Sequence, residues 1–119
     1  EADVKDAPLV KLVTLMLMEA IKERSTDIHI EPQETHISVR YRIDGILIES
    51  MTPPLTSLQG IVSRIKILSK LNIAERRLPQ DGRFTVKFPD REVDVRVSIL
   101  PTVHGEKVVM RLLDKSGFN

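Results

Sequence analysis

The sequence contains no cysteine and no tryptophan, and aromatic residues make up only 3% of it. Without cysteine the chain has no disulfide, no thiolate metal ligand and no cysteine nucleophile. The shortage of aromatic side chains argues against a platform on which the bases of single-stranded nucleic acid would stack. The formal net charge is +1, so an anion site must come from a local cluster of basic residues.

Long apolar runs are missing as well. The most apolar stretch, residues 9–18, contains Lys11 and is about half as long as a membrane-spanning helix needs to be. No secretory signal peptide is recognisable. The length of 119 residues fits one domain with a sizeable core. The first residue is Glu1 rather than Met, which is expected of a piece excised from a larger protein and equally of simple processing.

The motifs of a self-sufficient nucleotide hydrolase are also absent. The sequence has no G-x-x-x-x-G-K-[ST] loop and no Rossmann glycine pattern. Its three histidines, His29, His36 and His104, fall in different predicted elements without the spacing of metal ligands, so we predict no metal site. We therefore expect the chain alone to be inactive as an ATPase.

Hydrophobic periodicity predicts two helices. The first covers residues 9–24, with Asp6 as its N-cap and Pro8 in its first turn. Its apolar surface is wider than one stripe, which fits either a helix sunk in the core of its own domain or one partly covered by a neighbour. The second helix runs from residue 56 or 57 to Leu71, with Lys66 on its polar side.

Alternation of apolar and polar residues predicts about six strands, mostly connected by hairpins, over residues 26–31, 36–43, 46–50, 83–88, 92–100 and 106–113. The dipeptide Asp44-Gly45 is the strongest hairpin signal. We predict an α+β fold, a two-layer sandwich in which two helices pack on one face of a mostly antiparallel sheet. The single domain spans residues 7–113, between a leader at 1–6 and a linker at 114–119.

Residues 72–83 connect the second helix to the fourth strand and contain Arg76, Arg77 and Arg83 around Pro79 and Gly82. Proline removes a backbone donor and glycine permits a positive φ, so we predict a defined loop. Such a loop holds side chains in place for a ligand or a partner.

The strand alternation also predicts that one sheet face is polar. If the apolar positions face the helices, the opposite face carries Asp27, His29, Arg40, Arg42, Arg83, Lys87, Asp94 and Arg96. One interpretation is a phosphate site, because the planar guanidinium group binds phosphate oxygens through two hydrogen bonds. The other is a ladder of cross-strand salt bridges using Asp27, Glu31, Glu92 and Asp94.

Four stretches of the chain resemble the domain that precedes the ATPase core in assembly ATPases of type II secretion and type IV pilus systems. They are T-D-I-H-I-E-P at residues 26–32, R-Y-R-I-D-G at 40–45, R-I-K-I-L-S-K-L-N-I-A-E-R-R-L-P-Q-D-G-R at 64–83 and V-D-V-R-V-S-I-L-P-T-V-H-G-E-K-V-V-M-R-L-L at 93–113. Together they span roughly residues 7–113 in the order of the family. Thr26 departs from the small residue of many members.

The resemblance implies a PAS-like domain in front of a RecA-like core, within a homo-hexamer at the cytoplasmic face of the bacterial inner membrane. The core would hold ATP and Mg²⁺, and the domain alone would need no cofactor. Its arginines would help to neutralise the phosphates, with Arg83 and Arg96 as the first candidates, followed by Arg77, Arg76 and Arg42. Hydrolysis would move the domain and drive pilin or pseudopilin assembly through an inner-membrane platform protein.

A competing hypothesis is a non-enzymatic, PAS-like module that binds a nucleotide second messenger or a protein partner. It predicts measurable ligand affinity for the domain alone, whereas the ATPase hypothesis predicts very weak nucleotide binding without the core. A nucleic-acid binder ranks last because of the near-zero net charge and few aromatic residues.

Overall fold

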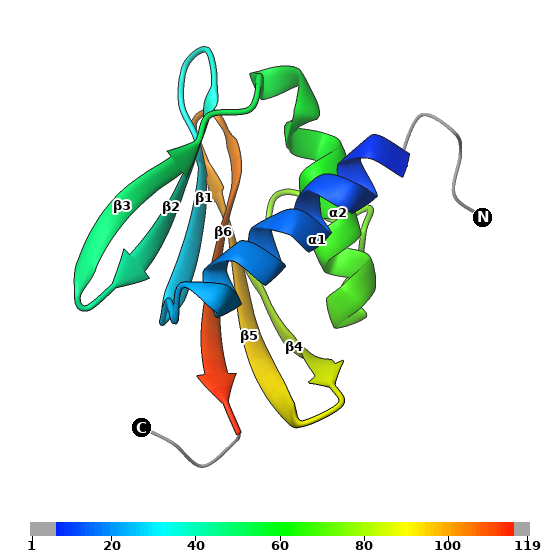
Figure 1. Ribbon diagram of the computed structural model, residues 1–119. Helices are drawn as coiled ribbons and strands as arrows, with labels where there is room; N and C mark the ends of the chain where they lie inside the picture. The colour runs from blue at the N-terminus through cyan, green and yellow to red at the C-terminus, as the bar shows by residue number, and fades with distance from the viewer. Residues whose placement is uncertain (1–6, 116–119) are drawn as a thin grey trace.

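The computed structural model describes residues 7–115, and within them it has two α-helices, a short 3-10 helix and six strands (Figure 1). In chain order they are α1 (Ala7–Lys22), β1 (Asp27–Pro32), β2 (Ile37–Ile43), β3 (Ile46–Met51), η2 (Leu55–Ser57), α2 (Leu58–Ser69), β4 (Gln80–Phe88), β5 (Arg91–Thr102) and β6 (Gly105–Asp114). The expected N-cap Asp6 lies outside the described residues, as does the expected linker from residue 116.

All six strands form one antiparallel sheet in the order β3-β2-β1-β6-β5-β4. Each helix is followed by three hairpin-connected strands, and the pairing of β1 with β6 joins the two sets. Asp44 and Gly45 form the predicted turn between β2 and β3, both with positive φ. The predicted α+β class and the predicted hairpins are therefore confirmed.

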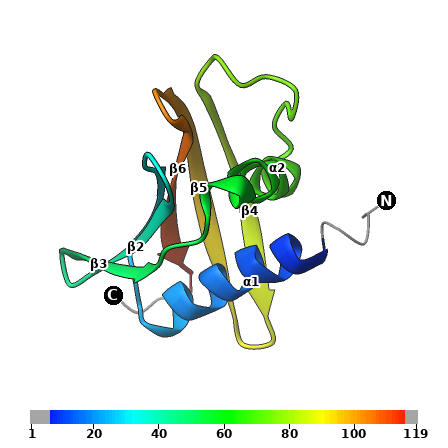
Figure 2. The ribbon, with the colours of Figure 1, turned by 90° about the horizontal axis from the view of Figure 1, so that it is seen from above.

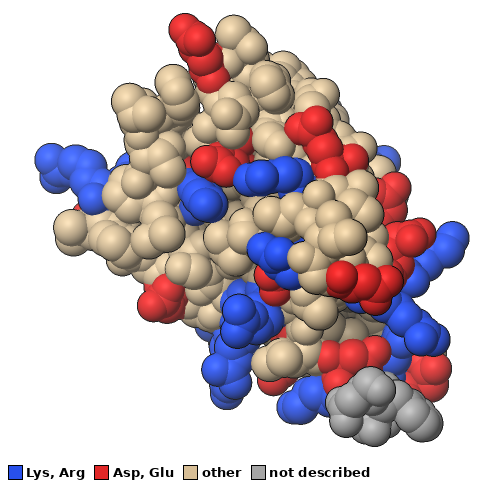
Figure 3. All heavy atoms as spheres, turned by 90° about the vertical axis from the view of Figure 1, so that its left-hand side faces the viewer, with Lys and Arg blue, Asp and Glu red and all other residues tan. Residues whose placement is uncertain are grey.

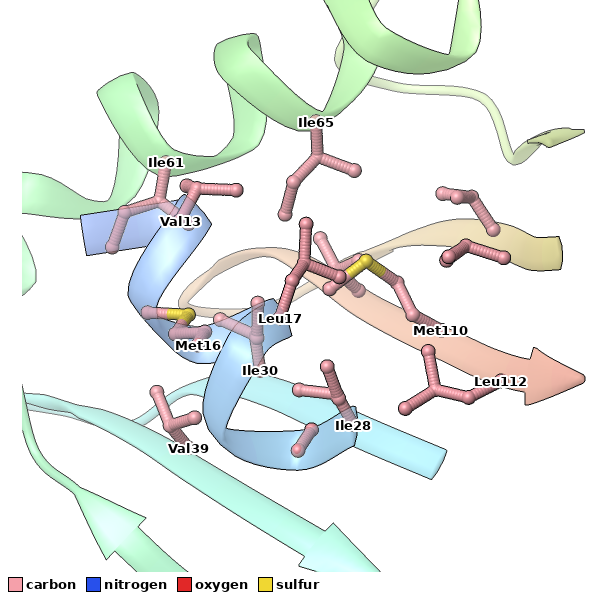
Figure 4. Packing of buried hydrophobic residues seen from close by; sticks show 14 of the residues in the cluster. Val13, Met16, Leu17, Ile28, Ile30, Val39, Ile61, Ile65, Met110 and Leu112 are labelled. Atoms are coloured by element: carbon pink, nitrogen blue, oxygen red, sulfur yellow. The ribbon is translucent and has the colours of Figure 1, made fainter. Parts of the chain in front are cut away.

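Both helices cover the same face of the sheet, as the view from above shows (Figure 2). Side chains from α1 and α2 point toward side chains from β1, β2 and β6 and form the hydrophobic core (Figure 4). Five α1 residues are buried in this core, namely Val13, Met16, Leu17, Ala20 and Ile21. The broad apolar surface of the helix is thus largely used inside its own domain, although Leu15 remains 50% exposed.

The predicted loop at residues 72–83 is shorter than expected, because β4 begins at Gln80. Gly82 lies inside this strand, and the described glycines with positive φ are Gly45 and Gly105. A Cβ atom at Gly82 would lie 2.9 Å from Leu71 Cδ2 and 3.1 Å from the Ser69 carbonyl oxygen. The glycine is therefore needed for the close approach of β4 to the end of α2, and its assignment to a positive-φ turn was wrong.

Lys66 is not on the polar surface of α2 as predicted, since it is only 1% exposed. Its Nζ donates to Glu106 Oε1 at 3.1 Å and to the Glu75 carbonyl oxygen at 2.6 Å. Glu106, the first residue of the last predicted strand, is buried in β6. The ammonium group of Lys66 therefore connects α2 with the loop that follows it and with β6, which lies 40 residues further along the chain.

Replacing Lys66 with alanine should strongly destabilise the chain, because it leaves the Glu106 carboxylate buried without its counter-charge. The expected loss in the free energy of unfolding is about 3–5 kcal/mol, measured by urea unfolding. The matched control is Lys11→Ala on the exposed side of α1. The double variant K66M/E106L removes both charges and should recover much of the loss. An unchanged stability of K66A would contradict the structural role of the pair.

Candidate functional site

The predicted polar face exists, and the strand register aligns arginines across it. Arg83 of β4 lies opposite Arg96 of β5, which lies opposite Arg111 of β6. Arg111 in turn lies opposite Asp27 of β1, and Asp27 lies opposite Arg42 of β2. We call these five residues the arginine row. Four of them are cationic and one is anionic, so the row is strongly basic although the whole chain is nearly neutral.

At one end of the arginine row, the arginines of β4 and β5 form no ion pairs within the described residues. Arg83 and Arg96 form no ion pair and no side-chain hydrogen bond within residues 7–115. They line an open hollow of about 540 Å³, whose complete lining is Asp81, Gly82, Arg83, Arg96, Val97, Ser98, Val109 and Arg111. Like charges directly opposite each other on a sheet repel, and a bound anion would relieve this repulsion. The hollow therefore has the charge and the donors to hold phosphate oxygens.

The other end of the polar face is a salt-bridge ladder. The Arg42 Nε donates to Asp27 Oδ2 at 3.0 Å, and Arg40 donates to Glu31 Oε1 at 2.7 Å. Arg42 also donates to the Gly45 carbonyl oxygen at 3.0 Å. The two interpretations of the polar face thus apply to different parts of it, and Arg42 belongs to the ladder.

Arg76 and Arg77 are not brought together with Arg83 and Arg96. Both lie in the loop before β4, and Arg76 lines a separate hollow of about 390 Å³ between the start of α2 and the turn from β5 to β6. The Arg77 backbone N–H donates to Glu75 Oε2 at 2.8 Å, and this bond lowers the pKa of the Glu75 carboxyl. The Gln80 side chain closes the loop with two hydrogen bonds of 2.9 Å to the backbone of Asn72. The loop is therefore held in the defined conformation that the sequence predicted.

Arg111 was not among the residues predicted for the site. The sequence places it in the last strand between the apolar residues Met110 and Leu112, which shows that it faces away from the core. Periodicity does not reveal which strand is its neighbour, and only the register with β5 and β1 puts it beside Arg96 and Asp27. The alternation of apolar and polar residues thus predicts that Arg111 faces away from the core, but it does not predict which strands lie beside it.

His29 lies on the polar face next to the arginine row. Its side chain is 14% exposed, and neither ring nitrogen has a hydrogen-bond partner within the described chain. His29 Nε2 lies 3.7 Å from Asp27 Oδ2, which is too long for a hydrogen bond. Burial lowers the pKa of His29 below its ordinary value of 6.5, and Asp27 opposes this shift only in part. The imidazole is therefore neutral at pH 7.

The surface beside β3 shows no single basic patch. On this side of the molecule, Lys and Arg side chains are interspersed with Asp and Glu side chains and with uncharged surface (Figure 3). Residues 7–115 contain no group of three or more His, Asp or Glu side chains suited to hold a metal ion. None of the helices in this range is long and apolar enough to cross a membrane.

The fold and the site define a small α+β domain with a basic sheet face and no hydrolase motif of its own. A family model described as "Type II/IV secretion system protein" matches residues 2–119 of the chain. The chain therefore belongs to this family, and the resemblance found in the sequence is confirmed.

Similar proteins include both secretion and pilus members of the family. The chain is 59% identical over 112 residues to the type IV pilus assembly ATPase PilB of Myxococcus xanthus, covering 93% of the chain and 20% of that protein. It is 54% identical over 111 residues to the type II secretion system ATPase E of Vibrio cholerae, covering 93% and 22%. It is also 54% identical over 110 residues to the type II secretion system protein E of Xanthomonas campestris, covering 92% and 19%. The chain spans about a fifth of the length of the curated relatives it matches.

The partly buried, neutral His29 predicts a loss of stability in mild acid. The unfolded chain takes up a proton near the ordinary pKa of 6.5, whereas the folded chain does so only at lower pH. The free energy of unfolding should therefore fall as the pH drops from about 7 to about 5.5. His29→Gln should flatten this fall in urea titrations, and His104→Gln in an exposed turn should not. Equal slopes for the parent chain and H29Q would show that His29 does not cause the effect.

Proposed function

We propose that this domain is the arm that precedes the core of a secretion or pilus assembly ATPase and supplies arginines to the phosphates of ATP bound on that core. The names of the relatives support the parent activity. The observation that carries the proposal is the alignment of Arg83, Arg96 and Arg111 across three adjacent strands. Three guanidinium groups in one row match the several oxygens of a polyphosphate.

The chemistry of this arm is electrostatic. Negative charge develops on the phosphoryl oxygens during transfer, and guanidinium groups already held in place stabilise that charge without reorganising. Because Arg83 and Arg96 form no ion pair within the described chain, they reach a phosphate without first breaking a salt bridge. The rigid sheet beneath them fixes their backbone positions.

The remaining candidates have a weaker geometric case. Arg42 would have to exchange its bonds with Asp27 and Gly45 for bonds to a phosphate. Arg76 and Arg77 lie on a different part of the surface and would reach the nucleotide only if the core approached the loop. We retain Arg77, Arg76 and Arg42 as phosphate contacts of second rank.

The core would supply what the domain lacks. In this proposal the core binds ATP and Mg²⁺ through Walker motifs, and the domain binds neither by itself. The parent is a homo-hexamer at the cytoplasmic face of the inner membrane, where movement of the arm drives pilin or pseudopilin assembly through a platform protein. Residues 114–119 would lead toward the core.

One observation favours the alternative of a separate ligand-binding module. The hollow beside Arg83 and Arg96 is open in the domain alone and already has its basic lining. If the isolated chain binds ATP analogues or a nucleotide second messenger at micromolar concentration, the module is a receptor in its own right. If it binds only after the core is added in trans, in a manner that depends on Arg83 and Arg96, the ATPase arm is supported.

In the full-length ATPase, Arg96→Ala should lower the turnover number by about 100-fold or more, because one donor to the developing phosphoryl charge is lost. The matched control is Lys87→Ala, which removes an exposed cation from the same face of the adjacent strand. ATP hydrolysis is measured together with thermal unfolding, which should be unchanged in both variants. Near-normal turnover of R96A would remove Arg96 from the mechanism.

A further inference from the structure

Asp27 is the only acidic residue in the arginine row, and it lies between Arg111 and Arg42. Its side chain is 12% exposed, and three basic groups surround its carboxylate. Arg42 Nε donates to Oδ2 at 3.0 Å, Arg111 Nε lies 3.7 Å from Oδ1, and His29 Nε2 lies 3.7 Å from Oδ2. The two carboxylate oxygens thus face the two ends of the sheet separately. Oδ2 faces the salt-bridge ladder and Oδ1 faces the hollow.

Arg111 has an exposed, flexible side chain that an acidic partner can restrict. Its side chain is 70% exposed, so it has many accessible rotamers and loses conformational entropy when it is fixed. Arg96 lies opposite it on one side and repels it, whereas Asp27 lies opposite it on the other side and attracts it. The two forces act in the same direction and draw the guanidinium group toward β1.

The ion pair between Asp27 and Arg111 joins Oδ1 to Nε at 3.7 Å, which is longer than a hydrogen bond. Within residues 7–115, Asp27 is the only residue that forms an ion pair with this guanidinium group. Arginine carries five N–H donors, so an ion pair at Nε leaves the donors of the terminal nitrogens for one anion.

We propose that Asp27 is a positioning residue, which acts through Arg111 by holding its guanidinium group in the orientation that meets the transferring phosphoryl group. The inference rests on the proposed function, because it assigns a task to a contact at that same site. Asp27 itself touches neither the nucleotide nor the reacting atoms. Its negative charge even opposes phosphate binding, so its presence in a phosphate-binding row is explained by geometry rather than by affinity.

This opposition gives a kinetic signature that a purely structural role does not have. Asp27→Asn keeps the size of the side chain but removes its charge. In the full-length ATPase we expect kcat to fall about 10- to 100-fold, because Arg111 is no longer held in place. The KM for ATP should stay the same or decrease, because the row gains one net positive charge. A structural defect would instead raise KM and lower the melting temperature.

The matched control is Glu31→Gln. Glu31 lies on the same face of β1 and binds one arginine, Arg40, at 2.7 Å, but it contacts neither Arg42 nor Arg111. E31Q should keep kcat within about twofold of the parent enzyme. A loss in E31Q as large as that in D27N would overturn the proposal, since any broken ion pair on this strand would then have the same effect.

A double-mutant cycle tests whether Asp27 acts through Arg111. If it does, adding D27N to Arg111→Ala should change kcat by less than about twofold, because the group that Asp27 positions is already absent. If the two losses multiply, or if Arg42→Ala alone reproduces the loss of D27N, the effect does not run through Arg111 and the inference is wrong.

The proposed function and this inference fail in different ways. Normal turnover of both R96A and R111A would contradict the proposed function itself. Impaired turnover of R96A and R111A with normal turnover of D27N would contradict only this inference.

Discussion

The antiparallel pairing of β1 with β6 is the contact on which the rest of the structure depends. It joins two sets of three hairpin-connected strands that are otherwise linked only through the helices and the chain between them. The same pairing places Asp27 opposite Arg111, and so it connects the salt-bridged end of the polar face with the end where Arg83 and Arg96 form no ion pairs within the described residues. A slip of this register by one residue would turn Arg111 toward the core and Met110 toward solvent. The buried apolar residues of both strands therefore fix the arginine row from beneath.

The buried Lys66–Glu106 ion pair performs a comparable task on the other face of the sheet. Removing two charges from water is costly, and a hydrophobic pair of similar size often stabilises a domain as well. Unlike a hydrophobic side chain, the ammonium group of Lys66 also donates a directional hydrogen bond to the Glu75 carbonyl oxygen at 2.6 Å. That bond fixes the loop before β4, and the Gln80 side chain fixes the same loop from its other end. The start of β4 is thereby positioned, three residues before Arg83.

Much of this fold could be predicted from periodicity, because the period of two in each strand and the wide apolar surface of the first helix are local properties. The polar sheet face, with Arg83 and Arg96 on it, followed from the same alternation and is confirmed by the register. Three features could not be predicted. Gly82 is required because Leu71 and Ser69 pack against it. Lys66 pairs with a carboxylate 40 residues further along the chain. Arg111 belongs to the site only because β5 places Arg96 opposite it. Each of these features depends on tertiary contacts between different segments, which local sequence patterns do not predict.

The arginine row is an unfavourable arrangement for stability alone. Each pair of like charges directly opposite on a sheet costs up to about 1 kcal/mol, and exposed ion pairs elsewhere on the face return little more than that. The chain has as many acidic residues as it would need for relief, with 17 Asp and Glu against 18 Lys and Arg. Yet Arg83 and Arg96 face each other and form no ion pair among the described residues, while Arg40 and Arg42 on the same face are paired. A uniform ladder would have been easy to build from these residues, so the uneven distribution of counter-charge is better explained by a site for an anion than by the folding of the sheet.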